Sequence, residues 1–217
     1  MNIVVSFADN TYTETIHAAK KFGMNFAELR IDLFTFIDVD RVIHERNKFD
    51  VPIIGTIRSK KENGNWKKSE KNRLSLFEKI MPHIDIVDIE LDSEKINTEV
   101  IKCARNHGKS VMISFHDFEK TPDVNTVVWD AIGLGADIVK IATKVSKEYD
   151  IRVLAKLLSD FSDIKLAIIG MGDFGLMTRI FFPALGSFMT FASAGIPTAP
   201  GQIHMQDMYE QLKRYYR

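Results

Sequence analysis

Short apolar runs alternate with longer segments of helical character along the whole chain. Many of these runs are apolar at consecutive positions, which is typical of parallel strands that are covered on both faces of their sheet. Eight runs rich in Val, Ile and Phe are predicted as strands, at residues 3–6, 26–33, 52–57, 84–91, 111–115, 137–142, 165–169 and 188–192.

The segments between these runs are predicted as helices, at residues 13–22, 38–47, 69–81, 93–107, 122–134, 147–159, 175–182 and 204–216. Their ends carry suitable residues. Gly23 and Gly108 follow two helix ends, Asp38 is placed to cap a helix start, and Pro122 lies near a first turn.

Eight βα units in 217 residues leave about 27 residues per unit, near the lower size limit of a (β/α)8 barrel. We therefore expect an α/β fold, a (β/α)8 TIM barrel, as a single catalytic domain over residues 1–217. A doubly wound open sheet is the alternative. The polar segment 59–71 has no apolar period and is expected to be a solvated loop before the third helix.

Composition narrows the class of protein. Hydrophobic residues make up 45% of the chain, and 29 basic residues balance 29 acidic ones, so nothing points to nucleic acid. Prolines and glycines interrupt the uncharged segment 180–206, and the first residues do not resemble a signal peptide, so no membrane association is expected. A single cysteine, Cys103, excludes a disulfide scaffold and a multi-cysteine zinc site, and favours a cytoplasmic location. No metal-binding motif is present.

Lys140 is the first candidate for chemistry. By strand alternation it shares a face with Ile138 and Ala142, in a run where a charged side chain is costly to bury. It is either an ion-paired or snorkelling lysine, or a desolvated amine that forms a Schiff base.

His116 is the second candidate, because it alone among six histidines closes a predicted strand. Imidazole is the commonest general acid and base. Carboxylates also collect at strand ends: Glu28 and Asp32 flank Arg30 on one face of the second strand, and Glu90 lies on the fourth. These charges form either an internal ion-pair network or part of a site, in which a carboxylate fixes the tautomer of the histidine.

Arg58 and Arg179 follow predicted strands, and a guanidinium binds a carboxylate through two hydrogen bonds. Gly170, Gly172 and Gly175 match the dinucleotide-binding pattern G-x-G-x-x-G, but after the seventh strand and with no acidic residue at the required distance. A tight turn that brings the backbone close to a ligand is the favoured interpretation.

These segments resemble the type I 3-dehydroquinate dehydratase family, over nearly the whole chain. The matching pieces are Glu28-Leu29-Arg30-Ile31-Asp32, Asp88-Ile89-Glu90-Leu91, Ser114-Phe115-His116-Asp117-Phe118, Gly135-Ala136-Asp137-Ile138-Val139-Lys140, Thr178-Arg179-Ile180 and Ala199-Pro200-Gly201-Gln202.

The resemblance implies a (β/α)8 barrel that converts 3-dehydroquinate to 3-dehydroshikimate, the third step of the shikimate pathway, without metal or cofactor and as a homodimer. It implies that Lys140 forms the Schiff base, that His116 is the general acid/base and that Glu90 supports the histidine. The substrate-binding residues that it implies are Ser6, Glu28, Arg30, Arg58, Arg179, Thr198 and Gln202. Thr198 stands where other members often have Ser.

Three other functions stay open at the level of sequence. A class I aldolase on the same barrel also uses a strand lysine. A catalytically silent barrel would act as a binding module, and a dinucleotide-binding protein is the third. The acid-free segment 193–206 is expected to be a loop that closes over the site and excludes water.

Overall fold

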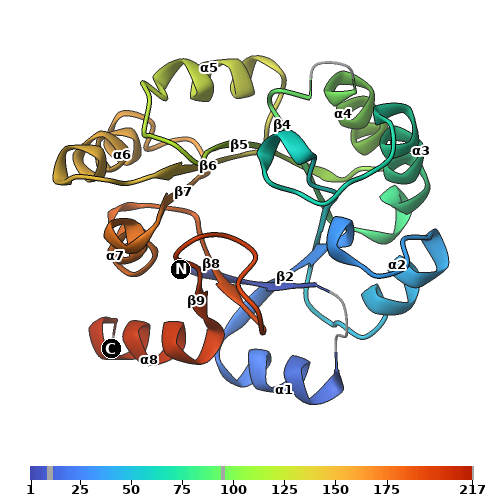
Figure 1. Ribbon diagram of the computed structural model, residues 1–217, viewed down its shortest axis with the longest axis horizontal. Helices are drawn as coiled ribbons and strands as arrows, with labels where there is room; N and C mark the ends of the chain where they lie inside the picture. The colour runs from blue at the N-terminus through green and yellow to red at the C-terminus, as the bar shows by residue number, and fades with distance from the viewer. Residues whose placement is uncertain (9–11, 94–95, 217) are drawn as a thin grey trace.

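A ring of parallel strands forms the centre of the molecule (Figure 1). The computed structural model describes residues 1–8, 12–93 and 96–216. Neighbouring strands follow the order β7-β6-β5-β4-β3-β2-β1-β8-β9. The strands are β1 (Asn2–Phe7), β2 (Met24–Arg30), β3 (Ile53–Thr56), β4 (Ile86–Glu90), β5 (Ser110–Asp117), β6 (Ile138–Lys144), β7 (Leu166–Met171), β8 (Met189–Ser193) and β9 (Ile203–His204).

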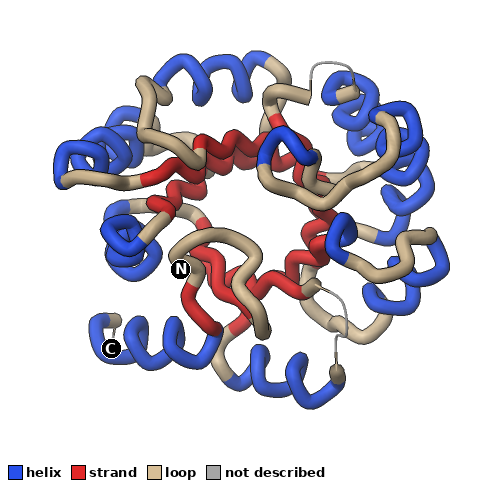
Figure 2. The backbone as a smooth tube through the Cα atoms, viewed as in Figure 1, coloured by secondary structure: helices blue, strands red, loops and turns tan. Residues whose placement is uncertain are grey.

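The ring closes between β7 and β8. The backbone N–H of Phe188 donates to the carbonyl of Leu166 at 2.6 Å, and the N–H of Ile168 donates to Oγ of Ser187 at 3.1 Å. Figure 2 shows the strands as an inner ring with the helices outside it. The predicted (β/α)8 barrel is confirmed.

Helices follow the strands and cover the outside of the ring (Figure 1). The α-helices are α1 (Thr13–Lys21), α2 (Val39–Arg46), α3 (Glu70–Ile80), α4 (Asn97–Asn106), α5 (Asn125–Gly133), α6 (Glu148–Asp160), α7 (Leu176–Phe181) and α8 (Met205–Tyr215). The 3₁₀ turns are η1 (Ile31–Leu33), η2 (Lys60–Glu62), η3 (Met81–His83), η4 (Asp173–Gly175) and η5 (Phe182–Leu185). Across the described ranges, no helix combines the length and apolar character that crossing a bilayer requires.

Strand alternation divides the inside of the barrel into an apolar floor and a polar upper part. Every second side chain of a strand points inward. Toward the beginnings of the strands these side chains form a buried apolar cluster that includes Val4, Ile54, Ile86, Met112 and Ile138. Two residues further along the same five strands, the buried side chains are Ser6, Thr56, Asp88, Ser114 and Lys140. The barrel therefore presents polar groups toward the ends of its strands, where barrel enzymes carry their active sites.

Two local expectations differ from the structure. The second strand ends at Arg30, so Asp32 lies in η1 rather than on the strand face, although it stays fully buried. Part of the predicted helix 93–107, at residues 94–95, lies outside the described residues, and α4 begins at Asn97.

The expectation of a solvated loop over residues 59–71 is wrong. This segment contains η2, and Glu62 and Trp66 are only 5% and 4% exposed. Trp66 joins the outer hydrophobic core, and the N–H of Gly64 donates to the carbonyl of Ser59 at 2.8 Å. The many lysines make the segment look solvated in the sequence, although the side chains of Glu62 and Trp66 turn inward.

The glycine-rich turn after β7 serves backbone packing. A Cβ on Gly175 would lie 2.4 Å from the carbonyl carbon of Gly170, so η4 lies directly against the strand. Gly172 has φ of +80°, and its backbone touches Gly201, where a Cβ would meet the Gly172 oxygen at 2.8 Å. These glycines bring backbone against backbone.

Replacing Gly175 with alanine is expected to destabilise the fold by about 1–3 kcal/mol, because the added methyl meets backbone that has no room to move. Urea unfolding measures the change. The control is Gly133→Ala at the end of α5, where a Cβ meets nothing within 4 Å. That variant should keep the parent stability or gain up to about 1 kcal/mol. Equal stabilities for the two variants would contradict this account of the turn.

Candidate active site

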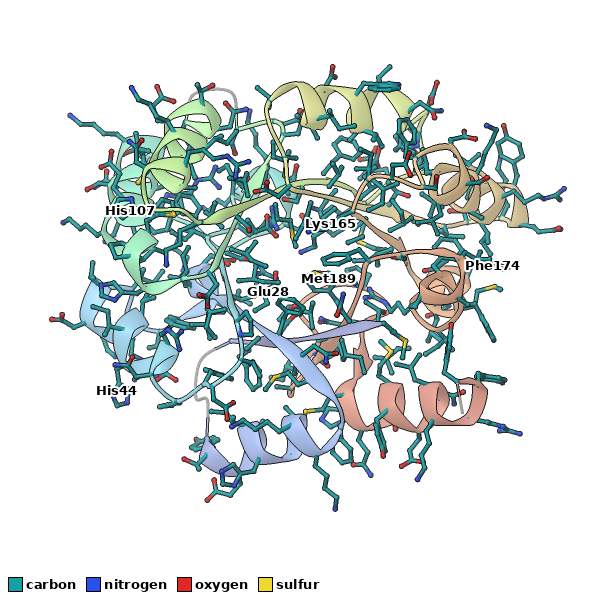
Figure 3. All side chains as sticks on the ribbon, turned by 180° about the vertical axis from the view of Figure 1, so that it is seen from behind. Glu28, His44, His107, Lys165, Phe174 and Met189 are labelled. Atoms are coloured by element: carbon teal, nitrogen blue, oxygen red, sulfur yellow. The ribbon has the colours of Figure 1, made fainter. Side chains whose placement is uncertain are left out.

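One pocket opens at the ends of the strands and gathers most of the side chains singled out in the sequence. Glu28 points toward the centre of the barrel in Figure 3. The sequence-predicted residues that line the pocket are Ser6, Glu28, Arg30, Arg58, His116, Lys140, Arg179, Thr198 and Gln202. Glu90 is buried behind this lining.

Lys140 lies inside the barrel on β6 and is 5% exposed. Its Nζ is 3.3 Å from Oε1 of Glu28 and 3.1 Å from Oδ2 of Asp88. It also lies 4.2 Å from the ring centre of Phe191, where the aromatic face attracts a cation. The amine is desolvated as the sequence indicated, but two carboxylates and a ring replace the lost water and stabilise its ammonium form.

Asp88 is held ionised by Arg58. Nη2 of Arg58 donates to both carboxylate oxygens at 2.8 Å, and Oγ of Ser114 donates to Oδ1 at 2.6 Å. Burial raises the pKa of Asp88, but the charges of Arg58 and Lys140 outweigh it and hold that pKa well below its usual value. Asp88 therefore carries its negative charge throughout the neutral range.

Glu28 joins the lysine to the loop between β8 and β9. Oγ of Ser6 donates to Oε2 of Glu28 at 2.5 Å, and Nε2 of Gln202 donates to Oγ of Ser6 at 3.2 Å. Burial raises the pKa of Glu28, but the nearby charges of Lys140 and Arg30 leave it below the usual value. The side chain of Gln202 in turn accepts the N–H of Thr198 at 2.6 Å, which ties the loop to the pocket.

His116 ends the inward face of β5 and contacts a carboxylate through Nδ1. Oε2 of Glu62, from η2, lies 2.6 Å from that nitrogen. Burial, together with the charges of Arg58 and Lys140, lowers the pKa of His116 well below its usual value. Burial also raises the pKa of Glu62 to about 8, against the opposing charge of Arg58. The imidazole is therefore neutral at pH 7, whereas Glu62 keeps its proton up to about pH 8. Once Glu62 ionises, it accepts the Nδ1 proton and leaves Nε2 as a base.

Glu62, and not Glu90, contacts Nδ1 of the histidine in the structure. Glu90 instead accepts Nη1 of Arg73 at 2.9 Å and the backbone N–H of Ser59 at 2.7 Å. The reason is strand register. Glu90 pairs with Ser114, whereas His116 lies two residues further along β5, beyond the end of β4. Glu90 thus anchors the start of the segment that carries Glu62.

Arg179 is a buried cation without a carboxylate partner in the described parts of the chain. It is 2% exposed, and its hydrogen bonds go to the carbonyls of Phe191 at 3.1 Å and Pro200 at 3.5 Å. Its buried Nε has no partner there. Burial lowers the pKa of Arg179 to about 10, so the guanidinium stays charged at pH 7. A buried charge of this kind is stabilised by an anionic ligand.

Comparisons with known proteins identify the family of the chain. The sequence profile of the family described as type I 3-dehydroquinase matches residues 3–217. The chain belongs to the type I 3-dehydroquinase family.

As a member of this family, the chain is an enzyme of the hydro-lyase class. A 3-dehydroquinate dehydratase of Methanococcus maripaludis is 38% identical over 224 residues, covering 97% of this chain and 98% of the relative. The crystal structure of the 3-dehydroquinate dehydratase from Aquifex aeolicus is 33% identical, covers 100% of both chains and has a TM-score of 0.88. That from Geobacillus kaustophilus is 28% identical, covers 100% of this chain and 92% of its own, and has a TM-score of 0.87.

Sequence reasoning missed Glu62, which lines the dehydroquinase pocket, and it missed the contact of Asp88 with Lys140. The sequence did contain a signal for Glu62, because it is a carboxylate four residues after Arg58, which follows a predicted strand. The neighbouring lysines made this segment resemble a solvated loop. Within the described ranges no cluster of three or more metal-binding side chains is present.

The stability of the dehydroquinase fold should fall as pH rises from 6.5 to 8. Folded Glu62 keeps a proton to about pH 8, whereas the unfolded chain releases it near 4.5, so the unfolded state binds fewer protons in this window. The lowered pKa of His116 has the opposite effect, which begins about one pH unit above its ordinary value of 6.5 and grows as pH falls, so it weakens the slope only at the acid end of this window. Urea unfolding at pH 6.5, 7.2 and 8 measures the slope. Glu62→Gln should flatten it and exposed Glu119→Gln should keep it; an unchanged slope in Glu62→Gln contradicts the prediction.

Proposed function

We propose that this chain removes water from 3-dehydroquinate to give 3-dehydroshikimate, through an imine between Lys140 and the substrate ketone. The single observation that carries the proposal is one pocket that holds a buried primary amine, a neutral imidazole and a guanidinium for which the described residues provide no carboxylate partner. These three groups match the ketone, the acidic C–H bond and the carboxylate of the substrate.

The ammonium of Lys140 first gives a proton to the neutral imidazole of His116, and the freed Nζ lone pair attacks the carbonyl carbon. A second Nζ proton and the proton returned by His116 then go to the carbonyl oxygen, which leaves as water and restores the neutral imidazole. The product is a cationic iminium with the same charge as the ammonium that it replaces. Glu28 and Asp88 therefore stabilise both species, and the pocket needs no charge rearrangement between them.

Elimination follows from the iminium. Nε2 of His116 takes a proton from the carbon next to the iminium, and the electron pair of that C–H bond moves into the neutral enamine. The enamine electrons then expel the β-hydroxyl group as water, and protonated His116 supplies the proton. Hydrolysis of the conjugated iminium releases the ketone and returns the free lysine.

The remaining lining residues hold the substrate. Arg179 binds the carboxylate, which supplies the anion that this buried guanidinium lacks. Glu28 and Arg30 bind ring hydroxyls, with Arg58 beside them. The loop residues Thr198 and Gln202 cover the bound substrate, and Ser6 connects Gln202 to Glu28. Closure of this loop keeps water away from the imine until the hydrolysis step.

We further propose that the chain is a single catalytic domain that acts in the cytoplasm as a homodimer, in the shikimate pathway. One free cysteine suits a reducing compartment.

The proposed homodimer is supported by exposed apolar side chains along α7 and its neighbours, and Phe174 lies at the outer edge of Figure 3. They are Phe174, Leu176, Met177, Phe181, Leu185 and Tyr215. Sedimentation equilibrium should give twice the mass of 24.8 kDa, and a monomer would contradict the proposal.

Two variants should separate the roles of the amine and the imidazole. With 3-dehydroquinate and borohydride, the parent is expected to carry a reduced adduct on Lys140, located by peptide mass mapping. Lys140→Ala should lose both the adduct and turnover. His116→Ala should keep the adduct but turn over roughly 10²–10⁴-fold more slowly, because only proton transfer is impaired.

The matched control is Lys144→Ala, which removes an exposed lysine at the end of the same strand. It should keep both adduct and turnover. An adduct that persists in Lys140→Ala, or normal turnover by His116→Ala, contradicts the mechanism. Sugar-phosphate cleavage without dehydroquinate turnover would favour the class I aldolase instead.

A further inference from the structure

Asp32 is a fully buried carboxylate that lies outside the pocket and contacts a residue of its lining. Nε of Arg30 donates to Oδ1 of Asp32 at 3.0 Å, and Nη2 of Arg30 donates to Oδ2 at 2.9 Å. This two-point contact fixes the plane of the guanidinium as well as its position. Asp32 is 0% exposed, and the Arg30 side chain is 8% exposed.

A third hydrogen bond fixes the carboxylate itself. The backbone N–H of Asn65 donates to Oδ2 of Asp32 at 3.0 Å. The turn before Asn65 is rigid, because Asn63 has φ of +55° and a Cβ on Gly64 would lie 2.1 Å from the carbonyl oxygen of Arg58. Asp32 is thus anchored to the segment after β3.

The bonds to Asp32 leave one nitrogen of Arg30 for the pocket. Nε and Nη2 donate to the carboxylate, and among the described residues Nη1 makes one long contact, 3.4 Å, to the carbonyl of Thr198. Arg30 lines the pocket beside Glu28. Nη1 is therefore the donor that is free to form a short hydrogen bond with a ligand.

We propose that Asp32 is a positioning residue that aims Nη1 of Arg30 at a substrate hydroxyl, and so contributes to recognition of a hydroxylated ring. The inference rests on the proposed dehydratase function. A buried polar donor in fixed geometry discriminates strongly against a ligand that lacks the matching group, because the donor is then left unpaired. Asp32 supplies that fixed geometry without touching the substrate.

The proposal predicts a change in KM with little change in kcat. Asp32→Asn keeps the shape of the side chain but replaces one acceptor oxygen by an NH2 group that faces a guanidinium or an N–H donor. Arg30 then loses its fixed plane, and KM for 3-dehydroquinate should rise about 10- to 100-fold, the range for a hydrogen bond to a charged group. Borohydride trapping on Lys140 at saturating substrate should be retained, and kcat should stay within about threefold.

A double-mutant cycle separates positioning from mere support of the fold. If Asp32 acts through Arg30, Asp32→Asn should raise KM little further in an Arg30→Ala background. The matched control is Glu45→Gln on α2, another buried carboxylate that pairs with cations, Arg41 and Lys48, but away from the pocket. It should lower stability and leave KM unchanged. If Asp32→Asn does not fold, Asp32→Glu, which shifts the carboxylate by one methylene, is measured with the same expectation.

The outcomes are distinct. An unchanged KM in the Asp32 variant, or KM increases that multiply fully in the double variant, overturns the inference while the parent remains an active dehydratase. A parent that neither traps nor dehydrates 3-dehydroquinate overturns the proposed function, and with it this inference.

Discussion

The charge of Lys140 is the interaction on which the site depends. An ammonium at the centre of a barrel is tolerated only when ionised partners replace its water, and Glu28 and Asp88 do so from β2 and β4. Asp88 stays ionised because Arg58 holds both of its oxygens. An imine on the same nitrogen is also cationic, so the framework that stabilises the resting lysine suits the reacting one. The resting network is therefore already arranged for the charge of the proposed covalent intermediate.

A second set of buried charges supports the first. Arg73 on α3 binds Glu90, and Glu90 holds the backbone N–H of Ser59. Ser59 begins the segment that carries Glu62 to His116. The barrel thus positions its imidazole partner through a helix, a strand and a 3₁₀ turn, each joined by a charged hydrogen bond. Hydrogen bonds of charged groups are shorter and stronger than neutral ones. They can therefore hold Glu62 in place although its segment is irregular.

The barrel and the strand-borne residues were predictable from sequence because the inward faces repeat with a period of two. Apolar residues such as Ile138 precede polar ones such as Lys140 on the same face, and the period alone places Lys140 and His116 inside. The sequence does not show whether Glu90 reaches the histidine, because a single sequence does not give the register between strands. Glu62 was missed because it turns inward from a lysine-rich 3₁₀ segment that has no period. Asp32 was expected on the strand, but it acts from the turn that follows.

The most direct test of the account is a crystal structure of the enzyme after reduction with 3-dehydroquinate and borohydride. The account predicts continuous electron density from Nζ of Lys140 to the former carbonyl carbon, with the substrate carboxylate on Arg179 and Nε2 of His116 facing the carbon that loses its proton. Density for an adduct on another residue, or a ligand carboxylate bound away from Arg179, would contradict it.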